Sequence, residues 1–215
     1  MIKIDVWSDV VCPFCYLGKK KLEVALQKLK LDSKSTIEWH SFQLDPTFPK
    51  NTSSPASEHL IHRKGLTLSQ IQSSHKRLTE LGHQYQIDFQ FDKAINFNTF
   101  DAHRLLHWSK EYQKQNELKN AFLEDHFSEG IDLSKRISLL KVIRKVGLNI
   151  STATEILDSE LYAQEFQNDI NLAKRIGITG VPFFVFNQKL AISGAQSDNV
   201  FEDALAEAAS SIVES

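Results

Sequence analysis

Cysteines and long apolar runs are what this sequence has least of. Its 215 residues contain only two cysteines, so any thiol chemistry must belong to that one pair. No apolar run approaches the ~20 residues that a membrane-spanning helix needs, and a net charge of −2 gives no electrostatic reason to expect nucleic acid or an anionic membrane as a partner. The chain begins directly with a strand pattern and shows no basic segment followed by an apolar stretch. We therefore expect no secretory signal and a cytoplasmic location.

The composition is that of an ordinary globular protein. Hydrophobic residues make up 41% of the chain and charged residues 24%, which is enough to build a sizeable core. A chain of this length fits one domain, or one domain that carries a large insertion. In a cytoplasmic setting a permanent structural disulfide is not expected. The cysteine pair is therefore more plausible as a cycling couple.

The two cysteines form the motif Cys12-Pro13-Phe14-Cys15, shortly after an alternating stretch at residues 2–7. This pattern predicts a strand, a loop and then a helix that opens with the dithiol. Pro13 suits the first helical turn, where its missing N–H would have had no partner. Side chains three apart on a helix lie about 5–6 Å from each other, which matches the separation that a disulfide requires.

The same position makes a specific prediction about reactivity. A helix N-terminus favours an anion, and the thiolate is the nucleophilic form of cysteine. We therefore expect a reversible redox couple in which Cys12 is the exposed, attacking thiol and Cys15 is the resolving one.

Two less specific interpretations of the cysteines stay open at this point. Half of a zinc site uses the same spacing, but a structural zinc site needs two more ligands, and the chain has no second cysteine pair. Its eight histidines are scattered, except for His59/His62 and His103/His107 inside helical patterns. We expect no metal and no cofactor. Two inert core cysteines are the other alternative, which leaves the proline between them unexplained.

The rest of the chain divides into a strand-and-helix part and a helical part. Residues 19–30 show helical spacing and residues 36–42 a second strand, an order that implies a parallel pair and an α/β fold. A Pro- and Ser-rich loop at residues 45–55 marks a boundary. Residues 54–147 show helical stripes and no convincing strand. We expect residues 1–50 and 151–215 to form one domain, and residues 51–150 to form an inserted helical domain.

The last third of the chain returns to mixed structure. A helical pattern runs over residues 151–176, with a break near residues 157–159. Phe183-Phe184-Val185-Phe186 is typical of a buried strand, and residues 189–193 follow as its hairpin partner. Ser197 or Asp198 would then cap a final helix.

Taken in order, these elements and motifs resemble a known family. Without the insert the order is β-α-β, helix, β-β-α, which is similar to the thioredoxin fold, and a helical insertion after the second strand is similar to its DsbA-like branch. The motifs resemble those of the FrnE-like cytoplasmic subfamily at residues 8–18, 42–46, 98–105, 177–186 and 193–196. The resemblance implies a thiol–disulfide oxidoreductase. Its partners would be protein thiols and disulfides or small thiols such as glutathione, and it would be a monomer or a homodimer.

The resemblance also implies roles for individual residues. Val181 and Pro182 would form a cis peptide beside the cysteines, where the Val181 backbone offers a short edge to a substrate strand. Pro13 and Phe14 would line the same substrate site. Asn98 and His103 match auxiliary positions in related isomerase and kappa-class transferase folds.

Phe14 departs from the family pattern. It stands where DsbA carries a histidine that stabilises the thiolate, so we expect a couple that is less oxidising than DsbA. Asp5 has two interpretations, a buried proton acceptor or a strand residue that faces solvent.

Two other functions compete with the oxidoreductase. One is a glutathione-dependent transferase or isomerase of the kappa or 2-hydroxychromene-2-carboxylate isomerase type. Those proteins usually keep a single nucleophile, so Cys15 argues against them. The other is a redox sensor without enzymatic activity, in which the dithiol only gates binding to a partner.

Overall fold

A computed structural model describes residues 1–213, and these form two compact units. The first, here called the redox unit, consists of residues 1–44 and the chain from residue 166 onward. The second, here called the helical unit, consists of residues 45–165. It extends beyond the predicted insert at both ends, since helix α7 (Ile150–Leu157) packs against helices α6 (Arg136–Lys145) and α4 (Phe100–Lys110). That the units are separate domains stays a prediction.

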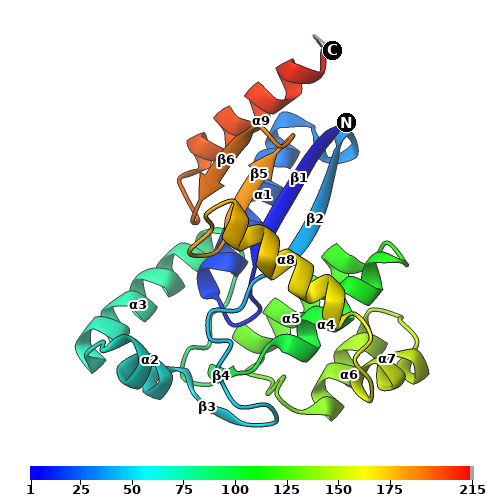
Figure 1. The fold of residues 1–215 in the computed structure, drawn as a ribbon. Coiled ribbons are helices and arrows are strands. Elements are labelled where there is room, and N and C mark those ends of the chain that lie inside the picture. The colour runs from blue at the N-terminus through cyan, green and yellow to red at the C-terminus, as the bar shows by residue number, and fades with distance from the viewer. Residues whose placement is uncertain (214–215) are drawn as a thin grey trace. The chain divides into compact units, whose positions relative to one another are not determined.

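The redox unit is built on a four-stranded sheet in the order β2-β1-β5-β6 (Figure 1). The strands are β1 (Ile2–Ser8), β2 (Ser35–Ser41), β5 (Phe183–Phe186) and β6 (Leu190–Ser193). β1 pairs in parallel with β2 and antiparallel with β5, and β5 forms an antiparallel hairpin with β6. The predicted parallel pair and the predicted hairpin are both confirmed. The α/β thioredoxin-like arrangement follows directly from this sheet.

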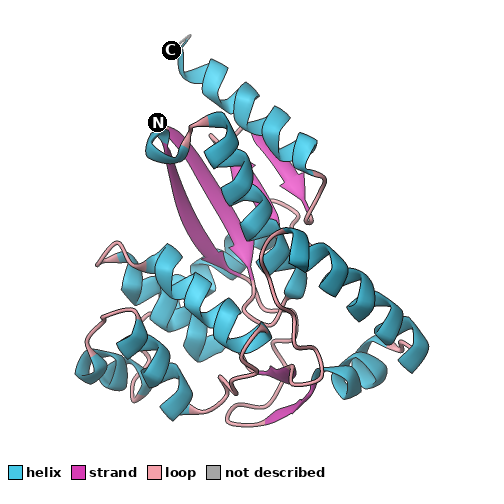
Figure 2. Cartoon of the chain, turned by 180° about the vertical axis from the view of Figure 1, so that it is seen from behind, coloured by secondary structure: helices cyan, strands magenta, loops and turns pink. Residues whose placement is uncertain are grey.

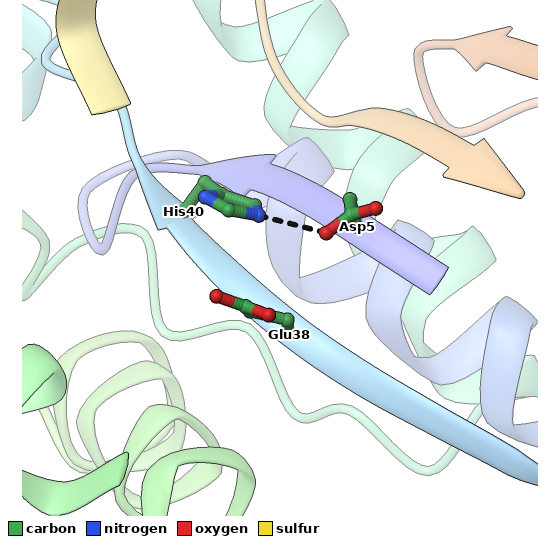
Figure 3. A group of neighbouring side chains, drawn as sticks. All are labelled: Asp5, Glu38 and His40. Carbon is green, nitrogen blue, oxygen red and sulfur yellow. Dashed lines mark hydrogen bonds and ion pairs between the residues drawn. The ribbon is translucent and has the colours of Figure 1, made fainter. Parts of the chain in front are cut away.

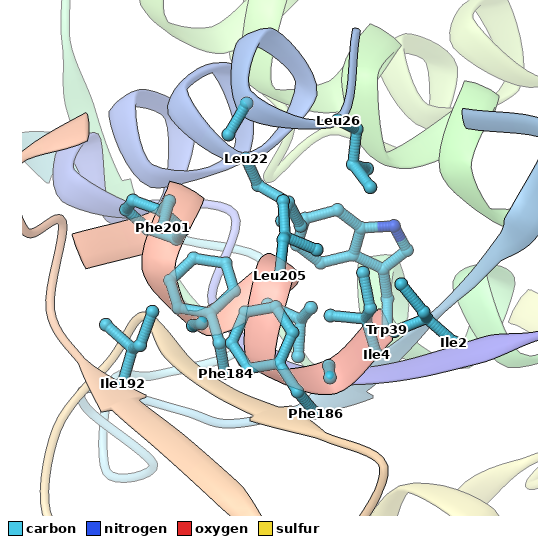
Figure 4. Packing of buried hydrophobic residues seen from close by; sticks show 14 residues of the cluster. Ile2, Ile4, Leu22, Leu26, Trp39, Phe184, Phe186, Ile192, Phe201 and Leu205 are labelled. Carbon is cyan, nitrogen blue, oxygen red and sulfur yellow. The ribbon is translucent and has the colours of Figure 1, made fainter. Parts of the chain in front are cut away.

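One face of the sheet is covered by α1 (Pro13–Leu29) and α9 (Asp198–Val213), which Figure 2 shows together on that face. The alternating residues of β1 that the sequence marked as apolar point into this layer. Figure 4 shows the resulting core, in which strand residues meet apolar positions of both helices: Ile2, Ile4, Leu22, Leu26, Trp39, Phe184, Phe186, Ile192, Phe201 and Leu205. The apolar residues at helical spacing on α1 and α9 therefore form the core on this face of the sheet.

The opposite face of the same sheet is covered by α8 (Ala163–Arg175). Trp7 of β1 packs there against Ala173 of α8 and against Ile178, which follows the helix. β1 is a central strand that pairs with β2 on one edge and with β5 on the other, and all of its residues except Lys3 are buried. Asp5 is accordingly only 6% exposed, so the interpretation of Asp5 as a solvent-facing residue is wrong.

Helix α1 begins where the dithiol motif predicts. Cys12 is the N-cap, with extended backbone angles, and Pro13 occupies the first helical position. The helix ends at Leu29 because Lys30 adopts a left-handed conformation (φ 56°), and Leu31 then donates to the Leu26 carbonyl. A short 3₁₀ turn, η1 (Asp32–Lys34), leads into β2.

The helical unit contains mostly helices, as predicted, and one feature that the prediction missed. Its other helices are α2 (Ala56–Lys64), α3 (Leu68–Gln84) and α5 (Gln115–Phe127). It also holds two short strands, β3 (Ser53–Pro55) and β4 (Ile95–Phe97), which pair antiparallel. The expectation of no strand in this region is therefore wrong. Strands of three residues are too short to show an alternating pattern.

Candidate active site

Cys12 and Cys15 lie together in the first turn of α1. Both are free thiols, and the backbone N–H of Cys15 donates to the Cys12 carbonyl at 3.0 Å. Cys12 is 3% exposed and Cys15 is 1% exposed. The prediction that Cys12 is the exposed thiol is therefore wrong, because both cysteines are buried. Attack by Cys12 requires a substrate to reach a largely enclosed sulfur.

The loop before β5 supplies the group that contacts Cys12. The Cys12 thiol donates to the Val181 carbonyl at 3.6 Å, and the Val181–Pro182 peptide bond is cis. Gly194 donates to the Pro182 carbonyl at 2.8 Å and so ties this loop to the end of β6. The residues that the resemblance assigned to one substrate site, Cys12 and Val181, are thus brought into contact.

Gly18 explains how α1 approaches this loop so closely. A Cβ atom at Gly18 would lie 3.0 Å from both the Pro182 ring and the Phe184 ring. A side chain at this position would require Pro182 and Phe184 to shift by a few tenths of an ångström, so glycine permits the close approach without that adjustment. Gly18 lies six residues, nearly two helical turns, after Cys12 and contacts the same loop that holds Val181.

Phe14 and Pro13 differ in solvent exposure, and therefore in the surface that a partner could contact. Phe14 is 46% exposed, whereas Pro13 is half-buried. An exposed aromatic ring two residues after Cys12 offers apolar contact area to a partner. This is compatible with the predicted substrate-binding role of Phe14.

The reduced Cys12 thiol is held in its protonated form. Hydrogen bonding to the Cys15 thiol, together with burial, raises the pKa of Cys12 well above its ordinary value, and the negative charge of Asp9 acts in the same direction. Among the influences on this pKa, the backbone amide of Cys15 acts in the opposite sense. The expectation that the helix N-terminus alone would favour thiolate at Cys12 is therefore wrong. The helix amide is outweighed by burial and by neighbouring groups.

Asp9 is the residue near the dithiol to which the sequence analysis gave no role. It lies on the loop between β1 and α1, and it is 1% exposed. Its carboxylate accepts the backbone N–H of Val10 at 2.8 Å and that of Leu44 at 2.9 Å. Its position three residues before Cys12 was the signal available in the sequence.

A second buried polar group lies between the sheet and α8. His40 of β2 contacts Asp169 of α8 through Nδ1 at 2.7 Å and Asp5 of β1 through Nε2 at 3.0 Å, a contact that Figure 3 shows. The Trp7 ring stacks on His40 with 4.4 Å between ring centroids, and the Trp7 indole donates to the Asp169 carbonyl. We call the trio Asp5, His40 and Asp169 the His40 clamp.

Burial and the carboxylate partners have opposite effects on the pKa of His40. Burial alone would lower the pKa of His40, but the hydrogen bonds with Asp169 and Asp5 outweigh it and raise this pKa to about 9. Asp5, Glu38 and His40 are also close enough to one another to hold a metal ion. However, the Lys3 ammonium lies 3.2 Å from Asp5 and 3.7 Å from Glu38, and so it already supplies the cation. The group is therefore best described as an ion-pair network.

With this geometry in place, comparison with known proteins identifies the family. The model of the DSBA-like thioredoxin domain matches residues 3–206. The chain belongs to the DSBA-like thioredoxin domain family. The crystal structure of SCO1869 from Streptomyces coelicolor, a probable DsbA oxidoreductase, is 30% identical and has a TM-score of 0.92, with 97% of this chain and 90% of that chain covered.

Two more distant solved structures share the fold of the family. One is a 2-hydroxychromene-2-carboxylate isomerase, 18% identical with a TM-score of 0.73, in which 99% of this chain and 98% of that chain are covered. The other is the cytosolic disulfide reductase DsbM from Pseudomonas aeruginosa with GSH, 16% identical with a TM-score of 0.65 and the same coverage of both chains. At these identities the likeness shows the fold alone. Within the described residues of this DSBA-like chain, none of the helices has the length and apolar character to cross a membrane.

The two predicted auxiliary residues, Asn98 and His103, both lie in the helical unit. The Asn98 side chain accepts the backbone N–H of Phe100 at 3.0 Å and donates to the Phe48 carbonyl at 2.7 Å, which braces the start of α4. His103 is buried on α4. The contacts of Asn98 are those of a structural residue, and a role for either residue in catalysis stays a prediction.

The helical unit also contains a pocket of about 410 Å³. The buried Arg104 guanidinium donates there to Asp101 at 2.7 Å and to the Ser159 carbonyl at 2.8 Å, and Arg136 pairs with Asp158. Two of the charged pairs that line the pocket are therefore satisfied within the helical unit, and Lys50 and Glu160 also belong to its lining.

Proposed function

We propose that this DSBA-like protein is a thiol–disulfide oxidoreductase whose Cys12–Cys15 pair alternates between dithiol and disulfide. The observation that carries the proposal is the placement of both cysteines in the first turn of α1, with the Cys12 thiol 3.6 Å from the Val181 carbonyl. Adjacent thiols in one helical turn can close a disulfide with little backbone movement. Membership of the FrnE-like subfamily and a cytoplasmic location are part of the same proposal.

The reaction proceeds by two successive exchanges. After its proton is lost, Cys12 attacks one sulfur of a substrate disulfide, and a mixed disulfide forms while the other substrate sulfur leaves as a thiolate. Cys15 then loses its proton and attacks the Cys12 sulfur, which closes the Cys12–Cys15 disulfide and releases the second substrate sulfur. Two electrons pass from the dithiol to the substrate, and two protons end on the released thiols. The reverse sequence oxidises a substrate dithiol.

Recognition of the substrate would rest on backbone and apolar contacts. Val181 offers main-chain groups beside the sulfur, and an extended peptide pairs with such an edge without regard to its side chains. The exposed ring of Phe14 adds apolar contact next to the attack site. These groups suit a cysteine-containing peptide, and glutathione is a small one. The GSH present in the DsbM structure supports small thiols as partners.

A redox equilibrium combined with an activity assay tests the proposal. The purified protein is incubated in glutathione buffers of graded potential, and intact mass reports the loss of two hydrogens when the disulfide forms. Insulin reduction is measured in parallel. We expect a single two-electron transition, and catalysis that is abolished by Cys12→Ser and reduced strongly by Cys15→Ser. Absence of the intramolecular disulfide at every potential would refute the proposal.

The same variants distinguish the competing isomerase or transferase function. A mechanism with one nucleophile needs only Cys12, so Cys15→Ser would then keep full activity toward glutathione-dependent conjugation or isomerisation. A dithiol mechanism predicts that Cys15→Ser cannot resolve its mixed disulfide. Full retention of activity in Cys15→Ser would therefore favour the alternative function.

A further inference from the structure

Residues 193–196, here called the 193–196 segment, lead from the end of β6 toward α9. The segment is a compact turn, in which the Gln196 side chain donates from Nε2 to the Ser193 carbonyl at 2.8 Å. Gly194 permits this turn because its φ of 81° lies in the left-handed region, which other residues rarely adopt. The Gly194 N–H and the Gln196 carbonyl are thereby presented to two different neighbours.

The first neighbour of the 193–196 segment is the loop that contacts Cys12. The Gly194 N–H donates to the Pro182 carbonyl at 2.8 Å. The residue before Pro182 is Val181, whose own carbonyl accepts the Cys12 thiol at 3.6 Å. The segment therefore holds the stretch of backbone that the proposed mechanism offers to a substrate, and a displacement of the segment would move the Val181 main-chain groups relative to the sulfur.

The second neighbour of the segment is Lys21 of α1. Its ammonium nitrogen Nζ donates to the Gln196 carbonyl at 2.9 Å and lies 3.3 Å from Oδ1 of Asp198, the first residue of α9. Lys21 is only 8% exposed, and lysine is rarely buried to this extent unless its charge is paired. Burial strengthens both contacts relative to the same contacts in water. Because Cys12 is the N-cap of the same helix, α1 carries both the proposed nucleophile and the residue that holds the segment.

We propose that Lys21, acting through the 193–196 segment, is a positioning residue that keeps the Val181 backbone in place beside Cys12 for an incoming peptide. The inference rests on the proposed function, and it deepens that function by naming the contact that orders the substrate edge before a substrate arrives. Without Lys21 the Gln196 carbonyl loses its charged donor, and the edge must be ordered during binding. That ordering costs affinity for an extended peptide, so recognition of the peptide backbone suffers more than sulfur exchange itself.

The experiment compares two disulfides that share one leaving group. One is an extended peptide whose single cysteine is joined to thionitrobenzoate, and the other is N-acetylcysteine amide joined to the same group. Cys12 attacks the cysteine sulfur, the coloured thionitrobenzoate leaves, and Cys15 then displaces the substrate thiol as the Cys12–Cys15 disulfide closes. The ratio of the two second-order rate constants, peptide over amino acid derivative, reports the use of the backbone edge. A general change in thiol reactivity cancels from this ratio.

Three variants separate positioning from general support of the fold. Lys21→Met should lower the ratio about tenfold, and it should speed amide hydrogen exchange at Gly194 by a similar factor, because one hydrogen bond to a charged group is lost. Lys21→Arg restores a cationic donor and should recover most of both quantities. Lys28→Met is the matched control, since Lys28 also lies on α1 and pairs with Glu202 of α9 at 2.7 Å. It should leave the ratio and the exchange rate unchanged.

Two outcomes in these variants would overturn the inference: an unchanged ratio in Lys21→Met, and an equal fall in Lys21→Met and Lys28→Met. Gln196→Ala keeps the test available if Lys21→Met does not fold, because it alters an exposed side chain and leaves Lys21 in place. This variant should lower the ratio and speed Gly194 exchange, and no change in either quantity would also overturn the inference. Failure of the wild type to close the Cys12–Cys15 disulfide would refute the proposed function instead, and the ratio could still be measured.

Discussion

The His40 clamp makes a quantitative prediction about stability. The folded-state pKa of His40 is about 9, against about 6.5 for an ordinary histidine. Because the folded value is raised, the stabilisation is fully present below pH 6.5 and is lost as the pH rises from 6.5 to 9. The difference corresponds to about 3 kcal/mol of unfolding free energy. The charged groups that face His40 are Asp5 and Lys3 on β1, Glu38 on β2 and Asp169 on α8.

Urea unfolding at a series of pH values measures this loss. The free energy of unfolding should fall by up to about 3 kcal/mol between pH 6.5 and pH 9 in the wild type, and the fall should be absent in His40→Gln. Subtracting the two curves is necessary, since the raised pKa of Cys12 also lowers stability once unfolded cysteines ionise above about pH 8.5. His83→Gln, which changes an exposed histidine of the helical unit, is the matched control.

Titration of the His40 ring tests whether its raised pKa is the cause of this pH dependence. The NMR signal of the His40 ring should titrate with a midpoint near 9, and Asp169→Asn should move that midpoint down because one carboxylate partner is removed. A midpoint near 6.5 in the wild type would refute the reasoning. Identical pH dependence of stability in the wild type and His40→Gln would do so as well.

Three further predictions concern the dithiol and its loop. Cys15→Ala should accumulate mixed disulfides with client thiols on non-reducing gels whereas Cys12→Ala should not, because the resolving thiol releases a trapped partner; equal trapping by both variants would contradict the exchange mechanism. Phe14→His should increase thiolate at neutral pH and raise the reduction potential by at most roughly 30–65 mV from a wild-type value of about −150 to −230 mV. If neither the thiolate fraction nor the reduction potential changes, Phe14 does not set the potential. Gly18→Ala should lower the unfolding free energy by about 1 kcal/mol, since crowding of Pro182 outweighs the gain in helix propensity. A more stable Gly18→Ala protein would show that the loop yields without cost.

Local sequence patterns predicted the parts of the redox unit that are defined over a few residues. The alternation in β1, the apolar run of β5 and the proline after Cys12 each specify a strand or a helix start by themselves. The resemblance in residue order then predicted the α/β fold with its helical insertion, which the sheet and the family match confirm. Elements that follow one another in the chain, such as β5 and β6, could be paired because the connection between them is short.

What the sequence could not predict depends on residues that are far apart in the chain. His40 and Asp169 are separated by 129 positions, so no periodicity links them, and their ion pair appears only when α8 covers the sheet. The enclosure of Cys12 has the same origin, since Val181 lies 169 positions away. A helix N-terminus considered alone favours a thiolate, but the folded neighbours of Cys12 reverse that preference. Electrostatics at a site requires the complete set of neighbours.

The redox unit is discontinuous in the chain, and this has a consequence for biosynthesis. β1, α1 and β2 emerge first, but one edge of β1 stays without its partner until β5 is made, and the apolar residues of α9 arrive last. The helical unit between them is contiguous in the chain. On the ribosome, the dithiol is therefore synthesised more than 160 residues before the carbonyl that covers it. Throughout that interval the nascent thiols depend on the reducing environment for protection, because their own fold does not yet shield them.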